Sequence, residues 1–261
     1  MFKKILEWLK RLFGRDSQSK IPAWDKCTLA SCWNGANASQ RMMNMLSPHM
    51  SDDKFTGYMN WMKGRGCNTA HLILANKADG ENAGYCIYGN TWTWVINTGF
   101  CNLMKARIKK LRDNKFGIVI WLFTDDSGAY VSEAKKNFPK YLSDCKAQGL
   151  LDSASTVVVG LELDEYYNGN DVASLVNATR TVYKGKIGTH QTSGKFNYAV
   201  LGDICFYQVS PGKTAAWLKN EAKRVKSATG KPLNFFEIER SPNRPKCEAA
   251  MAGGAFAVGN W

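Results

Sequence analysis

The chain has 261 residues, of which 44% are hydrophobic and 22% are charged, and its net charge is +13. These values fit a globular protein with one large domain or two small ones and a real hydrophobic core. The positive charge favours an anionic partner, such as nucleic acid, anionic lipid or an acidic polymer. No zinc-finger spacing, RNP-like run or Walker loop accompanies it, so we expect no specific nucleic-acid partner.

Eight cysteines are scattered along the chain without any CxxC pair. This spacing argues against a structural zinc site. No secretory signal precedes them, and a chain of this length does not need disulfides for stability. We therefore expect reduced thiols and synthesis in a cytoplasm, with the final location left open and a virus particle as one option.

Residues 1–14 form the pattern of a basic amphipathic helix, with an apolar stripe at helical spacing and basic residues opposite. The segment is too short and too charged to span a bilayer. Two interpretations remain: it lies on an anionic membrane or polymer surface, or it packs against the main domain or a partner subunit. A polar stretch follows, which predicts a helix and linker over 1–20 and a main domain over 21–261.

From residue 27 onward, apolar runs of strand length alternate with helix-like segments. The predicted strands are 29–33, 69–75, 117–123, 156–163, 186–190, 204–209, 233–238 and 255–258. The predicted helices are 52–63, 101–113, 132–148, 171–183, 214–227 and 246–252.

This alternation predicts a parallel sheet in an α/β fold. Eight such units in this length match a (β/α)8 barrel of the TIM type, with no eighth helix after the last strand. The amino-terminal helix would then fill the groove of the missing helix or close the barrel floor. A doubly wound open sheet is the alternative, although its glycine-rich phosphate-binding first turn is missing.

Polar and aromatic residues gather where the predicted strands end, which in such a barrel is the rim that carries the active site. This concentration of polar and aromatic residues at the strand ends predicts a site at that rim, and the prediction does not depend on any one residue. Histidines there would bind sugar hydroxyls or tune an acid, or would be ordinary core residues. The candidate substrate-binding residues are Asn34, His71, Asp125, His190, Tyr207, Gln208 and Trp261.

Two of these strand ends also carry acids, which are costly to bury without partners. Glu162, Asp164 and Glu165 end the 156–163 run, and Glu237 and Glu239 end the 233–238 run. In a regular strand, alternation puts Glu162 and Asp164 on one face of their strand, and Glu237 and Glu239 on one face of theirs. The alternative is a set of structural ion pairs with Arg240, Arg180 or lysines.

This arrangement resembles the TIM-barrel glycoside hydrolases, whose acids follow strands four and seven and whose sugar-stacking aromatic follows strand eight. The resemblance covers about residues 27–261 and assigns Glu165 as proton donor, Glu239 as nucleophile or base and Trp261 as sugar platform. Asp164 stands where the family has an asparagine, and it and Glu237 are the alternative catalytic acids. Residues 160–166 (GLELDEY) also resemble a shortened chitinase-type strand, which implies substrate-assisted cleavage of an N-acetylated sugar.

The resemblance implies a two-carboxylate hydrolysis of a bacterial surface or cell-wall polysaccharide. It implies no cofactor, and we assign no metal to Asp125, Asp126 or Asp164. The size, basic charge and amphipathic start are similar to those of glycosidase-like proteins encoded by bacteriophages. The alternative function is a non-catalytic barrel that serves as a structural or glycan-binding part of a phage assembly.

Overall fold

The computed structural model describes residues 42–64, 67–76, 84–124, 128–165, 167–192, 201–236, 238 and 243–258. The predicted strand at 29–33, the amphipathic segment 1–14 and its linker lie outside the described residues. The division into a helix with linker and a main domain therefore stays a prediction.

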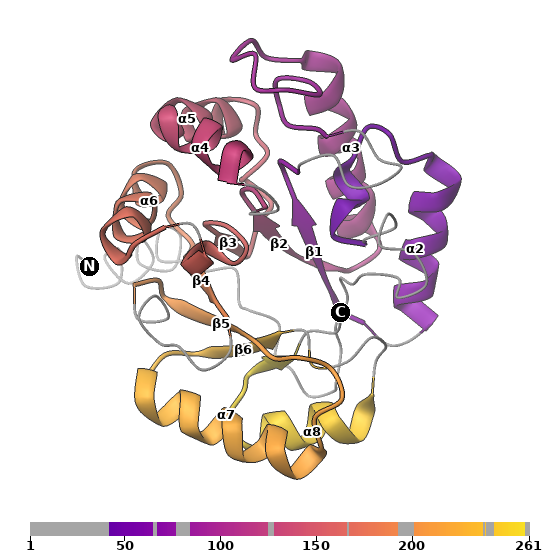
Figure 1. The fold of residues 1–261 in the computed structure, drawn as a ribbon. Coiled ribbons are helices and arrows are strands. Elements are labelled where there is room, and N and C mark those ends of the chain that lie inside the picture. Colours follow the sequence, from indigo (N-terminus) through magenta and orange to yellow (C-terminus); the bar gives the residue numbers. More distant parts are fainter. Residues whose placement is uncertain are drawn as a thin grey trace, which may run out of the picture.

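Seven parallel strands form one sheet in which each strand pairs with the next one along the chain. The sheet curls into a partial barrel (Figure 1), as the alternating pattern predicted. The strands are β1 (Thr69–Ile73), β2 (Gly117–Trp121), β3 (Thr156–Val158), β4 (Lys186–Gln191), β5 (Ile204–Gln208), β6 (Leu233–Phe236) and β7 (Ala257–Val258). They match the seven predicted strands that lie among the described residues.

Helices surround the sheet on the outside (Figure 1). They are η1 (Met42–Leu46), α2 (Asp52–Gly64), α3 (Thr98–Asp113), α4 (Gly128–Lys136), α5 (Phe138–Ala147), η2 (Leu163–Glu165), α6 (Gly169–Val182), α7 (Ala215–Thr229) and α8 (Arg244–Ala252). None of these helices is long and apolar enough to cross a membrane, a statement that covers the described residues alone.

The single helix predicted over 132–148 is two helices, α4 and α5, separated at Asn137. Pro139 lies in the first turn of α5, where its missing N–H costs nothing. Because proline disfavours helical geometry in the residues that precede it, the chain breaks there instead of continuing. The other predicted helices are confirmed to within a few residues.

Alternation along the strands divides the core into two sides. Residues such as Ile120, Val157 and Ile187 pack outward with helix residues, and α7 and α8 cover a second outer cluster on β5 and β6. The opposite faces meet in an inner cluster that contains no helix residue. Its members are Ile73, Val119, Trp121, Val158, Leu161, Ile204, Phe206 and Phe236. Side chains therefore fill the barrel interior, as is usual in this fold.

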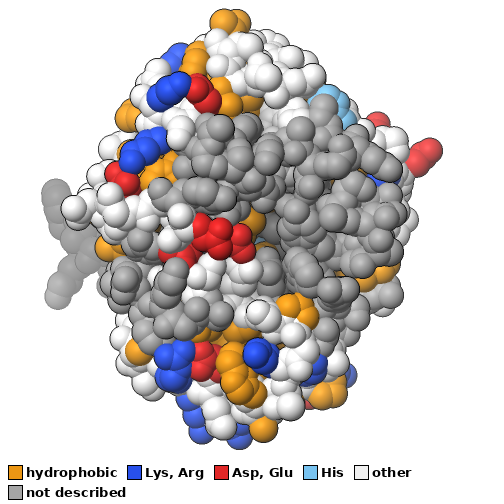
Figure 2. All heavy atoms as spheres, in the orientation of Figure 1, with side chains coloured by type: hydrophobic (Ala, Val, Ile, Leu, Met, Phe, Trp, Pro, Cys, Tyr) orange, Lys and Arg blue, Asp and Glu red, His pale blue; other side chains and the backbone are white. Residues whose placement is uncertain are grey.

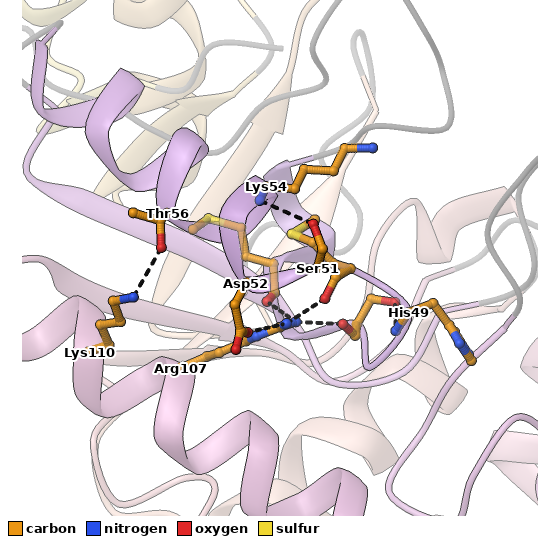
Figure 3. Close-up of polar contacts among 10 residues, drawn as sticks. His49, Ser51, Asp52, Lys54, Thr56, Arg107 and Lys110 are labelled. Atoms are coloured by element: carbon orange, nitrogen blue, oxygen red, sulfur yellow. Dashed lines mark hydrogen bonds and ion pairs between the residues drawn. The ribbon is translucent and has the colours of Figure 1, made fainter.

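A buried arginine ties the segment between η1 and α2 to α3. The Arg107 guanidinium donates to the carbonyl oxygens of Met45 (3.2 Å), Ser47 (2.6 Å) and Met50 (2.5 Å). It also pairs with Asp52 at 3.0 Å (Figure 3). The guanidinium thus satisfies the buried carbonyls of Met45 and Met50 and adds a second donor to that of Ser47, which also accepts from the Met50 N–H.

Candidate active site

The acids after β3 lie in a turn and not on a strand. β3 ends at Val158, five residues before the predicted end, and η2 begins at Leu163. Glu162 has a φ of 46°, a left-handed conformation that a strand does not accommodate. The expectation that alternation orients Glu162 and Asp164 is therefore wrong, because the chain has left the sheet before it reaches them.

Close packing sets the shape of this turn. A Cβ on Gly160 would lie 2.6 Å from Cδ2 of Leu163, whose side chain is fully buried. A residue larger than glycine would push Leu163 out and displace the turn. Glycine at 160 thus allows the chain to fold back immediately after the strand.

The three acids of the turn differ in exposure: Glu162 and Asp164 are half-buried and Glu165 is exposed. In Figure 2, acidic side chains gather near the middle of the visible face, over the region that Figure 1 labels β3 and β4. An acidic group at the carboxyl ends of parallel strands is placed where this fold carries its active sites.

The carboxylate of Asp164 is hydrogen-bonded to the end of β4. It accepts from Nε2 of Gln191 at 3.2 Å and from the backbone N–H of Thr192 at 3.4 Å. The Thr192 hydroxyl donates to the same carboxylate. Of the ion-pair partners suggested by the sequence, Arg180 instead pairs with Asp203 at 2.7 Å, and Arg240 lies outside the described residues.

His190 lies on β4 with its ring in the inner aromatic cluster, 5.3 Å from Trp121 and 5.8 Å from Phe236 between ring centroids. Its Nδ1 accepts a hydrogen bond of 2.8 Å from the backbone N–H of Glu162. Burial lowers the pKa of His190 to about 4, although the charges of Glu162 and Asp164 oppose this shift. The imidazole is therefore neutral at pH 7, with its proton on Nε2.

His71 lies in the middle of β1, deeper in the barrel than the strand ends. Its Nδ1 accepts from Nε1 of Trp121 at 3.2 Å, and its ring stacks on Phe236 at 5.5 Å. Burial lowers the pKa of His71 to about 3. Its Nε2, like that of His190, has no hydrogen-bond partner among the described residues. Both histidines thus belong to the barrel core, and only His190 also contacts the acidic turn.

The structure separates Tyr207 from the rest of the predicted site. Its ring belongs to the outer cluster between β5 and α7, and its hydroxyl donates to Glu221 at 2.7 Å. Arg224 donates to the same hydroxyl at 3.2 Å. Alternation along β5 thus directs Tyr207 outward, and its role in substrate binding stays a prediction that this packing does not favour. The next residue, Gln208, ends β5 on the inward side that Phe206 also faces.

Five predicted site residues lie outside the described residues: Asn34, Asp125, Glu237, Glu239 and Trp261. Their roles stay predictions. Within the described ranges, no group of three histidine, cysteine or acidic side chains could hold a metal ion.

Two residues at the site were not among the predicted site residues. They are Thr192, which directly follows β4, and Trp121, the last residue of β2. A signal for Thr192 was present in the sequence, because His190, Gln191 and Thr192 form a polar run directly at the end of an apolar strand. Trp121 offered no comparable signal, since a tryptophan in an apolar run is ordinarily core.

The sequence matches no protein-family model and no curated protein. Its structure is similar to a GH5_18 protein from Bifidobacterium longum subsp. infantis, with a TM-score of 0.64 at 10% identity over 90% of this chain and 69% of that one. A GH5_18 protein from Streptomyces cattleya in complex with Manβ1-4GlcNAc gives 0.64 at 10% identity, over 90% and 70%. An endo-1,4-β-mannanase from Eisenia fetida gives 0.54 at 12% identity, over 82% and 78%. The chain therefore has the TIM-barrel fold that is found in GH5 glycoside hydrolases.

Proposed function

We propose that this protein is a glycoside hydrolase that cleaves a β-linked polysaccharide of a bacterial surface or cell wall with two carboxylates. One observation carries the proposal: an acidic turn directly follows a barrel strand at the carboxyl end and is fixed there by the next strand. Glycoside hydrolysis uses a pair of carboxyl groups that flank the scissile bond, and this rim is where such groups would act. The net charge of +13 suits an anionic polymer as target.

Glu165 is the proton donor in this proposal. Of the acids in the turn it is the exposed one, whereas the Asp164 carboxylate is occupied by donors from β4. A proton donor must reach the glycosidic oxygen of a substrate that arrives from solvent. Exposure therefore favours Glu165 over Asp164.

Glu239 is the nucleophile or base, with Glu237 as the alternative. β6 ends at Phe236, and Ile238 is buried in the outer cluster under α7 and α8. Both glutamates lie outside the described residues, so this assignment rests on the resemblance to the TIM-barrel glycoside hydrolases and on their place just after β6.

The proposed chemistry uses these two groups alone. The Glu165 carboxylic acid protonates the leaving oxygen, while the Glu239 carboxylate attacks the anomeric carbon or removes a proton from an attacking water. A separation of about 5–5.5 Å between the carboxyl groups corresponds to retention, and about 6.5–9.5 Å to inversion. The similar structures include β-1,4-mannanases and a complex with Manβ1-4GlcNAc, so β-1,4-linked mannose is the first sugar to test.

The test measures reducing ends released from β-1,4-mannan, β-1,4-glucan, chitin and purified bacterial cell wall. We expect the full chain to cleave at least one of them, and Glu165→Gln and Glu239→Gln each to lower turnover by about 10²–10⁴-fold. Glu248→Gln is the matched control, because this exposed glutamate on α8 pairs only with Arg244 among the described contacts. The proposal fails if no polymer is cleaved, or if Glu165→Gln retains full activity with the best substrate.

A further inference from the structure

The carboxyl end of β4 holds the acidic turn at two separate points. His190 Nδ1 accepts from the backbone N–H of Glu162, and Gln191 and Thr192 donate to the carboxylate of Asp164. The three consecutive residues thus fix the turn from both of its ends. Glu165, which follows Asp164 directly, makes none of these contacts.

The first contact supports a strained backbone. Among the described residues, Glu162 is one of three other than glycine with a positive φ, a conformation that costs about 1–3 kcal/mol and persists only where the surroundings impose it. Its N–H has left the β3 ladder and finds its acceptor in the imidazole. Without that acceptor, the turn loses the hydrogen bond that fixes its first residue.

The second contact occupies Asp164. Oδ1 of Asp164 accepts from the Thr192 N–H, and Oδ2 accepts from the Gln191 side chain and the Thr192 hydroxyl, so both oxygens are turned toward the end of β4. A proton donor instead needs access to the glycosidic oxygen of a substrate. Asp164 is therefore suited to orienting the turn.

We propose that His190, Gln191, Thr192 and Asp164 form a positioning unit that sets the carboxyl group of Glu165 for proton donation, and that Asp164 is not itself the donor. This inference rests on the proposed function of the same rim. It assigns the histidine a role through the turn backbone and not through sugar hydroxyls. It also separates two adjacent acids that the sequence left as alternatives.

Matched variants isolate each contact. His190→Phe keeps an aromatic ring but removes the acceptor, whereas His190→Asn offers an amide oxygen near the position of Nδ1. Thr192→Val removes the hydroxyl that contacts Asp164. Thr189→Val is its control on the same strand, because the Thr189 hydroxyl is buried without a hydrogen-bond partner in the described structure.

Two substrates separate positioning from general damage. The polysaccharide that the wild-type chain cleaves needs its leaving oxygen protonated. A dinitrophenyl glycoside of the same sugar has a leaving group that departs without protonation by an acid. We expect kcat on the polysaccharide to fall about 100-fold in His190→Phe, the cost of an acid misplaced by about 1 Å, with KM nearly unchanged. The same variant keeps its rate on the dinitrophenyl glycoside within about threefold, and His190→Asn restores most of the loss on the polysaccharide.

Asp164→Asn gives the sharpest decision. It keeps an oxygen acceptor for the β4 donors, so it retains most activity on the polysaccharide, while Glu165→Gln loses it. Equal loss in both variants, or equal losses of His190→Phe on the two substrates, overturns the proposal.

A wild-type chain that cleaves nothing defeats the proposed function, and the positioning unit is then judged by the turn itself. We expect amide hydrogen exchange at Glu162 to accelerate at least tenfold in His190→Phe. In Thr192→Val and Thr189→Val, we expect exchange at Glu162 to stay as slow as in the wild type. Unchanged exchange at Glu162 in His190→Phe, with an unchanged turn in its crystal structure, overturns the positioning role independently of any activity.

Discussion

Replacing Arg107 with methionine tests whether a buried charge supports the segment that leads into α2. The guanidinium is 4% exposed and binds three backbone carbonyls in addition to Asp52. Methionine fills a similar length of space without donating a hydrogen bond. The substitution therefore removes the charged donor from three carbonyls, close to the Phe55 ring, whose centroid lies 5.3 Å from the guanidinium carbon.

The magnitude follows from these contacts. The Ser47 carbonyl keeps a hydrogen bond of 3.1 Å from the Met50 N–H, so the carbonyls of Met45 and Met50 are the two that lose their partner. Each buried carbonyl left without a partner costs about 1 kcal/mol at the lower end of the usual range, which gives about 2 kcal/mol for two. The ion pair adds little, because the Asp52 side chain is 80% exposed and exposed pairs contribute about 0–1 kcal/mol. For a protein of this size, about 2 kcal/mol lowers the thermal midpoint by about 4–8 °C.

Scanning calorimetry or circular dichroism measures the midpoint of Arg107→Met beside two controls. Asp52→Asn removes the ion pair but keeps the three carbonyl contacts, and Arg112→Met removes an exposed arginine of the same helix. We expect both to shift the midpoint by less than about 2 °C. A shift below about 3 °C for Arg107→Met, or an equal one for Asp52→Asn, would refute the assignment of stability to the carbonyl contacts.

Three further predictions follow from burial. Burial lowers the pKa of His71 to about 3 and that of His190 to about 4 in the folded chain. The unfolded state therefore binds more protons than the folded state below about pH 6.5. As a result, the free energy of unfolding falls by about 2 kcal/mol per histidine from pH 7 to pH 5. The double variant His71→Gln/His190→Asn flattens this slope in urea titrations, and an unchanged slope contradicts it. Burial raises the pKa of the Cys86 and Cys205 thiols to about 12. Six of the eight cysteines are buried, so we expect Ellman's reagent at pH 8 to modify at most two of them before denaturation. Tyr207→Phe costs about 1 kcal/mol of stability but leaves polysaccharide cleavage unchanged; a lost activity would return this tyrosine to the site.

The order and type of the elements were predictable because each depends on local patterns. The run 117–123 is uniformly apolar, as a strand buried on both faces must be, and β2 lies within it. Asn97 and Thr214 cap α3 and α7 with their side chains, which fixes helix starts by short-range chemistry. Such signals do not depend on what the rest of the chain does.

The direction of individual side chains near strand ends was less predictable. Alternation over a continuous strand to residue 163 would orient Glu162 and Asp164, but β3 has only three residues before Gly160 lets the chain turn back. Nothing in the local pattern GLELDE distinguishes a strand end from a turn, because its leucines occupy alternate positions in both cases. The strand is ended by tertiary packing of Leu163, which sequence periodicity does not contain.

The same limit applied to Tyr207, where a polar tip suggested a site and the register of β5 decided otherwise. Its partner Glu221 lies 14 residues away on α7, so only the packed structure brings the two together. By contrast, the prediction of a site from the polarity of strand ends as a group does not depend on the direction of any one side chain. It averages over several strands, so an error in the direction of one residue does not remove it.

The filling of the barrel restricts where chemistry can take place. Trp121, Phe206 and Phe236 occupy its centre with ring-centroid separations of 5.1–5.3 Å for the tryptophan pairs. Polar groups therefore gather above this layer, where His190 has one nitrogen among the aromatic rings and the other on the turn backbone. A neutral imidazole serves there because it accepts a hydrogen bond without bringing a charge into an apolar interior. His190 thus links the aromatic core to the acidic turn. Whether the rim is a catalytic site or a structural feature depends on whether this link positions the carboxyl group of Glu165.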